Sequence, residues 1–129
     1  MANGYGIPPD IEHQLRARDE LCVYCRKPMK AYPRTKGTPA DKATIEHLNN
    51  RPPFYWGEGL ERSGVEGIAI CCGACNSSRS NKPLAAWFAS LYCVERDINL
   101  RTVAPIVKRF LRRHPRDETR AALEGDVVP

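Results

Sequence analysis

Two pairs of cysteines have the spacing that brings thiolates onto a single metal ion. Cys22 and Cys25 are separated by two residues, and Cys72 and Cys75 repeat this gap later in the chain. Because four thiolates on two such turns complete a tetrahedral shell, the pattern predicts a structural zinc site. Four reduced, buried thiols or a redox pair are the alternatives.

Two further cysteines stand outside this set. Cys71 is a rival ligand, since Cys71-x3-Cys75 is also a permitted spacing, but Cys72 repeats the gap of the first pair and is favoured. Cys93 falls on an apolar helical face and is expected to be a small core residue. A thiol oxidoreductase is disfavoured, because neither CxxC has the strand-to-helix context of that motif.

A carboxylate, an imidazole and an amide form a second group that could do chemistry. Glu46 and His47 are adjacent in TIEHLNN, and Asn76 directly follows the second cysteine pair. A hard divalent cation prefers oxygen ligands, so Glu46 and Asn76 are candidates to bind one. The cation would neutralise a phosphate oxygen, and His47 would take a proton from the attacking water. The group predicts a metal-assisted hydrolytic site.

This hypothesis needs a particular local geometry. Side chains alternate along a regular strand, so Glu46 and His47 converge only where the strand bends or ends. The residues that would end it follow closely: Asn49, Asn50, Pro52 and Pro53. A solvated Glu beside a packed His, and an Asn76 that only caps the following helix, are the alternatives.

The elements that must position these residues alternate between helix and strand. A helix is expected over 9–18, where Pro stands at the start and Ile11 and Leu15 share a face. Strands are expected over 43–48 and 66–72, joined by an unusually long connection. The stretch 31–42 is expected to be an exposed loop.

The later part of the chain is expected to be helical. One or two turns are predicted over 76–80, and Pro83 suits the first turn of another helix. The apolar face of that helix would comprise Leu84, Trp87, Phe88 and Leu91. Asn99 or Thr102 is expected to cap a last helix. Its apolar stripe would comprise Val103, Ile106, Val107 and Phe110.

Length and charge restrict the class of protein. The 129 residues suit a single domain, with 20 Lys and Arg against 15 Asp and Glu, a net charge of +5 and a pI near 9.0. This excess permits a nucleic-acid partner, and basic residues without acids concentrate in 101–116. No stretch approaches the roughly 20 apolar residues of a membrane span, and no secretory signal is seen. We therefore expect a cytoplasmic protein with reduced thiols.

The order of these motifs resembles that of the HNH endonucleases of the zinc-clipped ββα-metal kind. The matching stretches are CVYC, then ATIEHL, then GIAICCGACNSSRSNK, and they span residues 11 to about 82. The residues that follow, PLAAWFASLYCVERDI, resemble the helical continuation of small bacterial and phage members. The resemblance implies an α+β fold. Its small ββα-metal core would carry a zinc clip, flanked by an N-terminal helix and two C-terminal helices.

The resemblance also implies roles for individual residues. His47 would be the general base, and Glu46 and Asn76 would bind the catalytic divalent cation, Mg²⁺ or Mn²⁺. The ligands of the structural zinc would be Cys22, Cys25, Cys72 and Cys75. Arg79 falls where the family often has a Lys that meets phosphate. Further candidate contacts to DNA are Lys82, Lys108, Arg109, Arg112 and Arg113.

One position departs from the family's pattern. Gly67 stands where the family usually has a middle Asn that braces the hairpin loop, and Asn49 or Asn50 could replace it. Three aromatic residues in that loop could stack on bases, although packing over the hairpin is favoured. They are Phe54, Tyr55 and Trp56.

The sequence therefore predicts one domain over 1–129, with a nuclease core at 9–82, a helical extension at 83–116 and a frayed tail at 117–129. The leading hypothesis is a metal-dependent endonuclease that nicks or cuts DNA. The alternative is a zinc-dependent nucleic-acid-binding module without catalysis. The pattern favours no particular oligomeric state.

Overall fold

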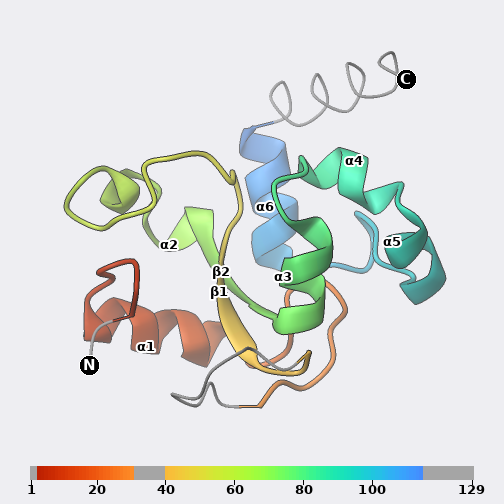
Figure 1. Ribbon diagram of the computed structural model, residues 1–129, viewed down its shortest axis with the longest axis horizontal. Coiled ribbons are helices and arrows are strands. Elements are labelled where there is room, and N and C mark those ends of the chain that lie inside the picture. Colours follow the sequence, from red (N-terminus) through yellow and green to blue (C-terminus); the bar gives the residue numbers. More distant parts are fainter. Residues whose placement is uncertain (1–2, 31–39, 115–129) are drawn as a thin grey trace.

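The structure, a computed structural model, describes residues 3–30 and 40–114. It is a mixed α+β fold built around a two-stranded antiparallel sheet of β1 (Ala43–His47) and β2 (Ile68–Cys72). Helix α1 lies on one side of this sheet, while α3 and the later helices lie on the other (Figure 1). The α+β class is confirmed, and the nuclease core stays a prediction.

Helix α1 (Pro9–Arg18) has the bounds that the sequence predicts, with Pro in its first turn. Its end is fastened to the sheet by two adjacent charged residues. The Arg18 guanidinium donates to the carbonyl of Ile68 at 2.7 Å, and the Asp19 carboxylate accepts from the amide of Ile70 at 3.0 Å. Asp19 is buried, so these bonds hold α1 against β2.

The pairing of the strands decides which side chains share a face. Glu46 stands opposite Ala69, and His47 stands opposite Ile68. Because side chains alternate, Glu46 faces α3 and His47 faces α1. The α1 face carries a small core of Ile7, Leu15, Ile45, Leu60, Ile68 and Ile70.

The other face of the sheet carries the larger core. Tyr24, Trp87 and Phe110 are its largest side chains, and they come from the cysteine turn and from two different helices. Tyr24 and Trp87 meet edge to face, with ring centroids 4.9 Å apart. The described part of the extension, 83–114, therefore packs against the same core as the sheet.

The chain after β2 is divided into more helices than expected. The elements are α3 (Gly73–Arg79), α4 (Leu84–Phe88), α5 (Leu91–Arg96) and α6 (Pro105–Arg113). The prediction of two C-terminal helices after the core is wrong, because Ser90 is extended and separates α4 from α5. Its hydroxyl accepts a hydrogen bond from the amide of Cys93 at 3.4 Å, so Ser90 is an N-cap.

The cap predicted for the last helix is also wrong. Helix α6 follows Ala104, which has no capping side chain, and begins at Pro105. Asn99 and Thr102 instead close the preceding turn, where the Thr102 hydroxyl accepts from the amide of Asn99 at 2.9 Å. The buried residues of α6 are Ile106, Val107 and Phe110, as predicted.

The connection between the strands holds two short helical turns, η1 (Leu60–Arg62) and α2 (Gly64–Gly67), so β2 begins at Ile68. A Cβ at Gly67 would approach that of Ser63 to 2.6 Å. Gly67 therefore leaves no room for an asparagine. The Asn50 amide donates instead to the Ser80 carbonyl at 2.8 Å and ties this connection to the end of α3.

Two further predictions fall wholly or mostly outside the described residues. These are most of the loop expected at 31–42 and the tail expected to fray at 117–129. Within the described ranges, no helix is long and apolar enough to cross a membrane.

Candidate metal centre and the polar cluster beside it

Four cysteine sulfurs gather where the turn at 22–25 meets the junction of β2 and α3. The sulfurs of Cys22, Cys25, Cys72 and Cys75 all lie within 4.8 Å of one another. Those of Cys25 and Cys72 are 3.8 Å apart. Four sulfurs around one tetrahedral zinc stand about 3.8 Å apart, given Zn–S bonds of about 2.3 Å. The cluster could therefore hold a structural metal ion such as zinc.

Local backbone structure places these sulfurs. Cys72 is the last residue of β2, and α3 starts one residue later, so Cys75 lies in the first turn of the helix. The other turn is closed by hydrogen bonds between the backbones of Cys22 and Lys27 at 2.9 Å and of Arg26 and Cys22 at 3.0 Å. Both pairs are thus held by main-chain bonds that do not depend on the metal.

The thiols influence one another strongly. Hydrogen bonds from neighbouring thiols, that of Cys22 first, lower the pKa of Cys25 and bring the pKa of Cys72 to about 7. Hydrogen bonds with neighbouring thiols raise the pKa of Cys22 and of Cys75. Metal ligation requires thiolates, so a bound cation would have to favour deprotonation of these two cysteines. Cys75 also contacts the Tyr92 hydroxyl at 3.4 Å. Tyr92 is a polar neighbour of the kind that orients a metal ligand.

The choice between the two rival cysteines is decided by the strand. Cys71 precedes Cys72 in β2 and points to the buried face beside Thr44, with its sulfur 3.7 Å from the Thr44 hydroxyl. It is not part of the four-sulfur cluster. Cys93 is also outside the cluster and buried, as the sequence predicts.

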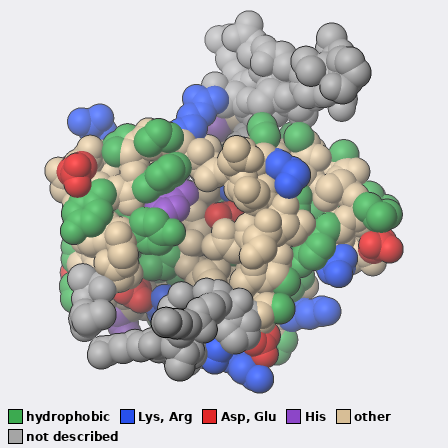
Figure 2. Space-filling model, in the orientation of Figure 1, with side chains coloured by type: hydrophobic (Ala, Val, Ile, Leu, Met, Phe, Trp, Pro, Cys, Tyr) green, Lys and Arg blue, Asp and Glu red, His purple; other side chains and the backbone are tan. Residues whose placement is uncertain are grey.

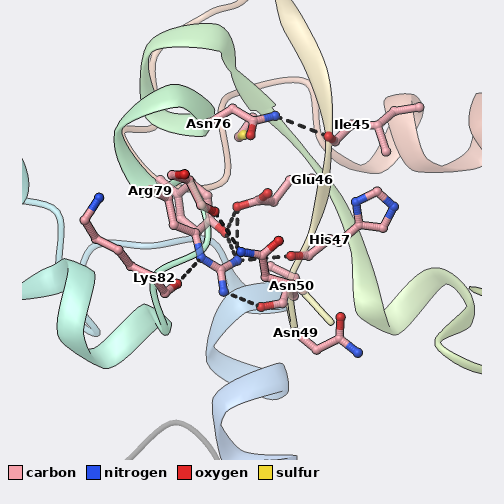
Figure 3. A network of polar contacts seen from close by, with 12 residues as sticks. Ile45, Glu46, His47, Asn49, Asn50, Asn76, Arg79 and Lys82 are labelled. Carbon is pink, nitrogen blue, oxygen red and sulfur yellow. Dashed lines mark hydrogen bonds and ion pairs between the residues drawn. The ribbon is translucent and has the colours of Figure 1, made fainter. Parts of the chain in front are cut away.

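Glu46 lies in a buried polar cluster with Arg79 (Figure 3), and Tyr24 belongs to the same cluster. Its carboxylate accepts from the Tyr24 hydroxyl at 2.6 Å and from the Arg79 guanidinium at 3.1 Å. Glu46 is 5% exposed and Arg79 only 1%. Burial raises the pKa of Glu46, while Arg79 and the Tyr24 hydroxyl oppose this shift. The carboxylate predicted to bind a cation therefore already has a positive partner.

Arg79 is held in this position by several acceptors. Its guanidinium donates to the carbonyls of His47 at 3.1 Å, Leu48 at 2.7 Å and Lys82 at 2.9 Å. The interpretation of Arg79 as a surface contact to DNA phosphate is wrong for this conformation, because the side chain is fully buried. It instead joins α3 to the end of β1.

Asn76 lies on α3 and reaches the same face of the sheet as Glu46. Its amide nitrogen donates to the Thr44 hydroxyl at 2.9 Å and to the Ile45 carbonyl at 3.3 Å. The amide nitrogen is thus turned toward β1 (Figure 3). Asn76 does not cap α3, since the N-cap residue is Cys72.

His47 is separated from Glu46 by the strand itself. Its imidazole points away from Arg79 and Asn76 in Figure 3 and is 7% exposed. The ring lies 4.4 Å from that of Tyr5, edge on, and 4.9 Å from that of Phe54. Among the described residues, none pairs with His47 Nε2. Burial first, and the charge of Arg79 second, lower the pKa of His47 to about 4.

The three residues proposed for the catalytic site are therefore divided between the two faces of the sheet. Glu46 and Asn76 share the α3 face of β1, whereas His47 lies beneath aromatic rings on the opposite face. The strand remains paired through His47, so it does not bend in the way that convergence requires. In this conformation His47 does not meet a water molecule bound beside Glu46.

The basic residues predicted to contact DNA differ in their freedom. Lys82 and Arg112 are exposed, and the Lys82 ammonium donates to the Ser78 carbonyl at 2.9 Å. Arg109 is paired with Glu66 at 3.0 Å and Arg113 with Glu66 at 3.8 Å. Lys108 is half-buried on α6. On the face of the molecule drawn in Figure 2, the Lys and Arg side chains are scattered and do not gather in one patch.

Sequence reasoning missed four residues that shape these sites: Tyr5, Tyr24, Arg79 as an ion-pair partner, and Tyr92. The signal for Tyr24 was its place between the two cysteines of CVYC. The side chains between those cysteines, Val23 and Tyr24, are both buried in the larger core. Tyr5 and Tyr92 carry no such signal, since their contacts depend on how distant segments pack.

Comparisons of the chain with protein-family models, with curated proteins and with solved structures gave no match.

Proposed function

We propose that the protein is a metal-dependent endonuclease of the HNH kind, which hydrolyses phosphodiester bonds of DNA. One observation carries the proposal. An antiparallel hairpin runs directly into a helix, four cysteines fasten the junction, and Asn76 on that helix bonds to β1 next to Glu46. A strand–strand–helix unit with a carboxylate and an amide on one face supports a nuclease better than it supports a plain zinc turn.

The ion in the cysteine cluster is zinc in this proposal, and its role is structural. Four thiolate ligands leave no open position for a substrate or water. The ion would join the turn at 22–25 to β2 and α3, and so fix the helix that carries Asn76. This role matches a small domain whose sheet, within 3–30 and 40–114, has two strands.

A second, hard divalent cation is assigned to Glu46 and Asn76. A carboxylate and an amide oxygen are ligand types that Mg²⁺ and Mn²⁺ accept, and Glu46 and Asn76 share the α3 face of β1. The donor types therefore fit a cation. When bound there, it would supply charge neutralisation at a phosphate oxygen.

His47 is the proposed general base. A pKa of about 4 keeps the imidazole neutral near pH 7, with a lone pair that can accept a proton, but it also makes the buried ring a weak base. Tyr5 and Phe54 cover the ring on the α1 face. The proposal therefore requires both to move apart and the end of β1 to turn before His47 meets a water beside Glu46.

Lys82 and Arg112 are proposed to contact DNA phosphates. A reducing, cytoplasmic location is also proposed, because the cysteines are free thiols.

A non-catalytic, zinc-dependent nucleic-acid-binding module is the second candidate. Two specific observations favour it: Arg79 occupies the Glu46 carboxylate, and His47 is buried on the opposite face. Such a module would keep the cysteine cluster and the positive charge and would need neither Glu46 nor His47 for its activity.

Conversion of supercoiled plasmid to nicked or linear DNA separates the two candidates. The assay compares the wild type, His47→Ala and the control His13→Ala, whose histidine is exposed on α1. It is run with Mg²⁺, with Mn²⁺ and without either, and bound zinc is measured in parallel. We expect cation-dependent cleavage that His47→Ala abolishes and His13→Ala retains. Binding without cleavage by folded, zinc-loaded protein would favour the module.

A further inference from the structure

We propose that Arg79 and the catalytic cation compete for the carboxylate of Glu46, so that a cation binds only as the guanidinium withdraws. The inference rests on the proposed function, because it takes Glu46 as a cation ligand. It adds that Arg79 controls the affinity of Glu46 for the cation, a role that neither the motif nor its spacing indicates.

The first argument is electrostatic. The Arg79 guanidinium lies 3.1 Å from Glu46 Oε2, and both side chains are almost fully buried. A divalent cation bound to the same carboxylate would stand within a few ångströms of a fixed positive charge. Repulsion between charges at such separations is strong where water is excluded. The cation and the guanidinium therefore do not share Glu46 in this arrangement.

The second argument is that Arg79 is held by more than the ion pair. Three backbone carbonyls accept from its guanidinium, those of His47, Leu48 and Lys82. A cation must offset the loss of whichever of these bonds break when Arg79 leaves. The arrangement predicts weak cation binding by the wild type, with Arg79 setting the threshold.

The third argument concerns the ends of the network. Arg79 is the last residue of α3, and two of its acceptors are the final residue of β1 and the residue after it. Asn50, two residues further on, donates to the Ser80 carbonyl beside Arg79. Withdrawal of Arg79 therefore loosens the contact between α3 and the chain that leaves β1.

The test measures the affinity of zinc-loaded, full-length protein for Mn²⁺ by electron paramagnetic resonance. Arg79→Met removes the charge and keeps an apolar stem, and Arg79→Lys keeps a charge without the planar fork. Arg101→Met makes the same change in net charge at an exposed position and is the matched control. Glu46→Gln in the Arg79→Met background reports whether Glu46 is the ligand.

We expect Arg79→Met to bind Mn²⁺ at least about tenfold more tightly than the wild type, which is a modest part of the repulsion removed. Arg79→Lys should fall between them, Arg101→Met should match the wild type, and the added Glu46→Gln should abolish the gain. Glu46-dependent binding of equal strength in the wild type and Arg79→Met would overturn the competition alone. Absence of Mn²⁺ binding in every variant would overturn the proposed function as well.

A measurement on the wild type keeps the inference testable if Arg79→Met fails to fold. The Nε–H proton of Arg79, bonded at 2.9 Å to the Lys82 carbonyl, is followed by NMR as Mg²⁺ is added. Competition requires this proton to exchange faster with water as the cation binds. An unchanged exchange rate, while the amide signals of Glu46 and Asn76 shift to saturation, would overturn the competition.

Discussion

Glu46 and His47, consecutive in the chain, point to opposite faces of the same two-stranded sheet. Glu46 meets Tyr24 and Arg79 on the α3 side, and the His47 ring meets Tyr5 and Phe54 on the α1 side. Each is buried, but the two burials have different consequences. The charge of the Glu46 carboxylate is balanced by Arg79, whereas burial keeps the His47 imidazole uncharged.

The buried imidazole predicts a dependence of stability on pH. The pKa of His47 is about 4 in the folded protein and near 6.5 when unfolded, so the unfolded chain binds more protons between these values. Stability should be complete above pH 6.5 and fall as the pH drops toward 4, by up to about 3 kcal/mol. Urea unfolding at pH 7.5 and pH 5 measures this loss.

His47→Phe should remove the part of the pH-dependent loss of stability that His47 contributes, because it removes the titrating group. A phenyl ring also suits a site between two aromatic rings. His13→Gln, on the exposed side of α1, should leave the pH dependence as in the wild type. Equal pH dependence in His47→Phe and the wild type would show that other groups, including the cysteines, cause the loss.

The cysteine cluster predicts which thiol the metal needs. Cys72→Ala should lose the bound metal and with it folding free energy on the order of 10 kcal/mol, as in small zinc domains. Cys71→Ala, its neighbour on β2, should keep one metal ion per chain and lose only packing. Elemental analysis and thermal denaturation of both variants decide the matter, and metal retained by Cys72→Ala would contradict the assignment.

The hydroxyl of Tyr92 predicts a smaller effect at the same cluster. Its contact with the Cys75 sulfur at 3.4 Å is lost in Tyr92→Phe, while the ring still stacks near Trp87 and under Arg96. We expect about tenfold weaker zinc binding, measured by competition with a chromogenic chelator. Ser90→Ala, at the start of the same helix, is a control for helix stability; if it weakens zinc binding equally, the hydroxyl contact is not the cause.

The Glu46–Arg79 pair predicts non-additive losses of stability. Glu46→Gln and Arg79→Met each remove one partner, and Arg79→Met leaves a buried carboxylate unpaired at a cost of about 3–5 kcal/mol. The double variant should recover part of this loss, since neither charge then remains in the apolar interior. Urea unfolding of the four proteins gives the coupling free energy. Simple addition of the two losses would mean that the pair is not coupled.

Surface charge predicts a graded effect on DNA affinity. Arg112 is exposed on α6, so Arg112→Ala should weaken binding and reduce the slope of log K against log salt by about 0.9. Arg109 is held by Glu66 at 3.0 Å, and Arg109→Ala should change the slope less. Fluorescence anisotropy over a range of salt concentrations measures both, and identical slopes for all three proteins would exclude α6 from the interface.

The sequence predicted the elements that follow from local patterns. Helix 9–18, the two strands and the four cysteines are set by turn spacing, Pro placement and alternation, which act over a few residues. Contacts between distant segments were beyond it. The pairing of Arg79 with Glu46, and the burial of His47 beneath Tyr5, depend on how α3 and the N-terminal segment pack against β1. The break between α4 and α5 was missed because a single capping serine outweighed a continuous apolar pattern.

The cysteine cluster also divides the chain into three parts, which are one closed loop, the residues before it and the residues after it. When the metal is bound, everything between Cys25 and Cys72 is one tethered loop whose ends cannot separate. The entropy of closing such a loop grows only slowly with its length, by about 0.6 kcal/mol for each doubling. Gly57 lies in an exposed turn of this loop at a φ of +90°, and a Cβ added there would meet nothing within 4 Å. Extra residues inserted at that point should therefore lengthen the loop while the rest of the domain keeps its shape and nearly all of its stability.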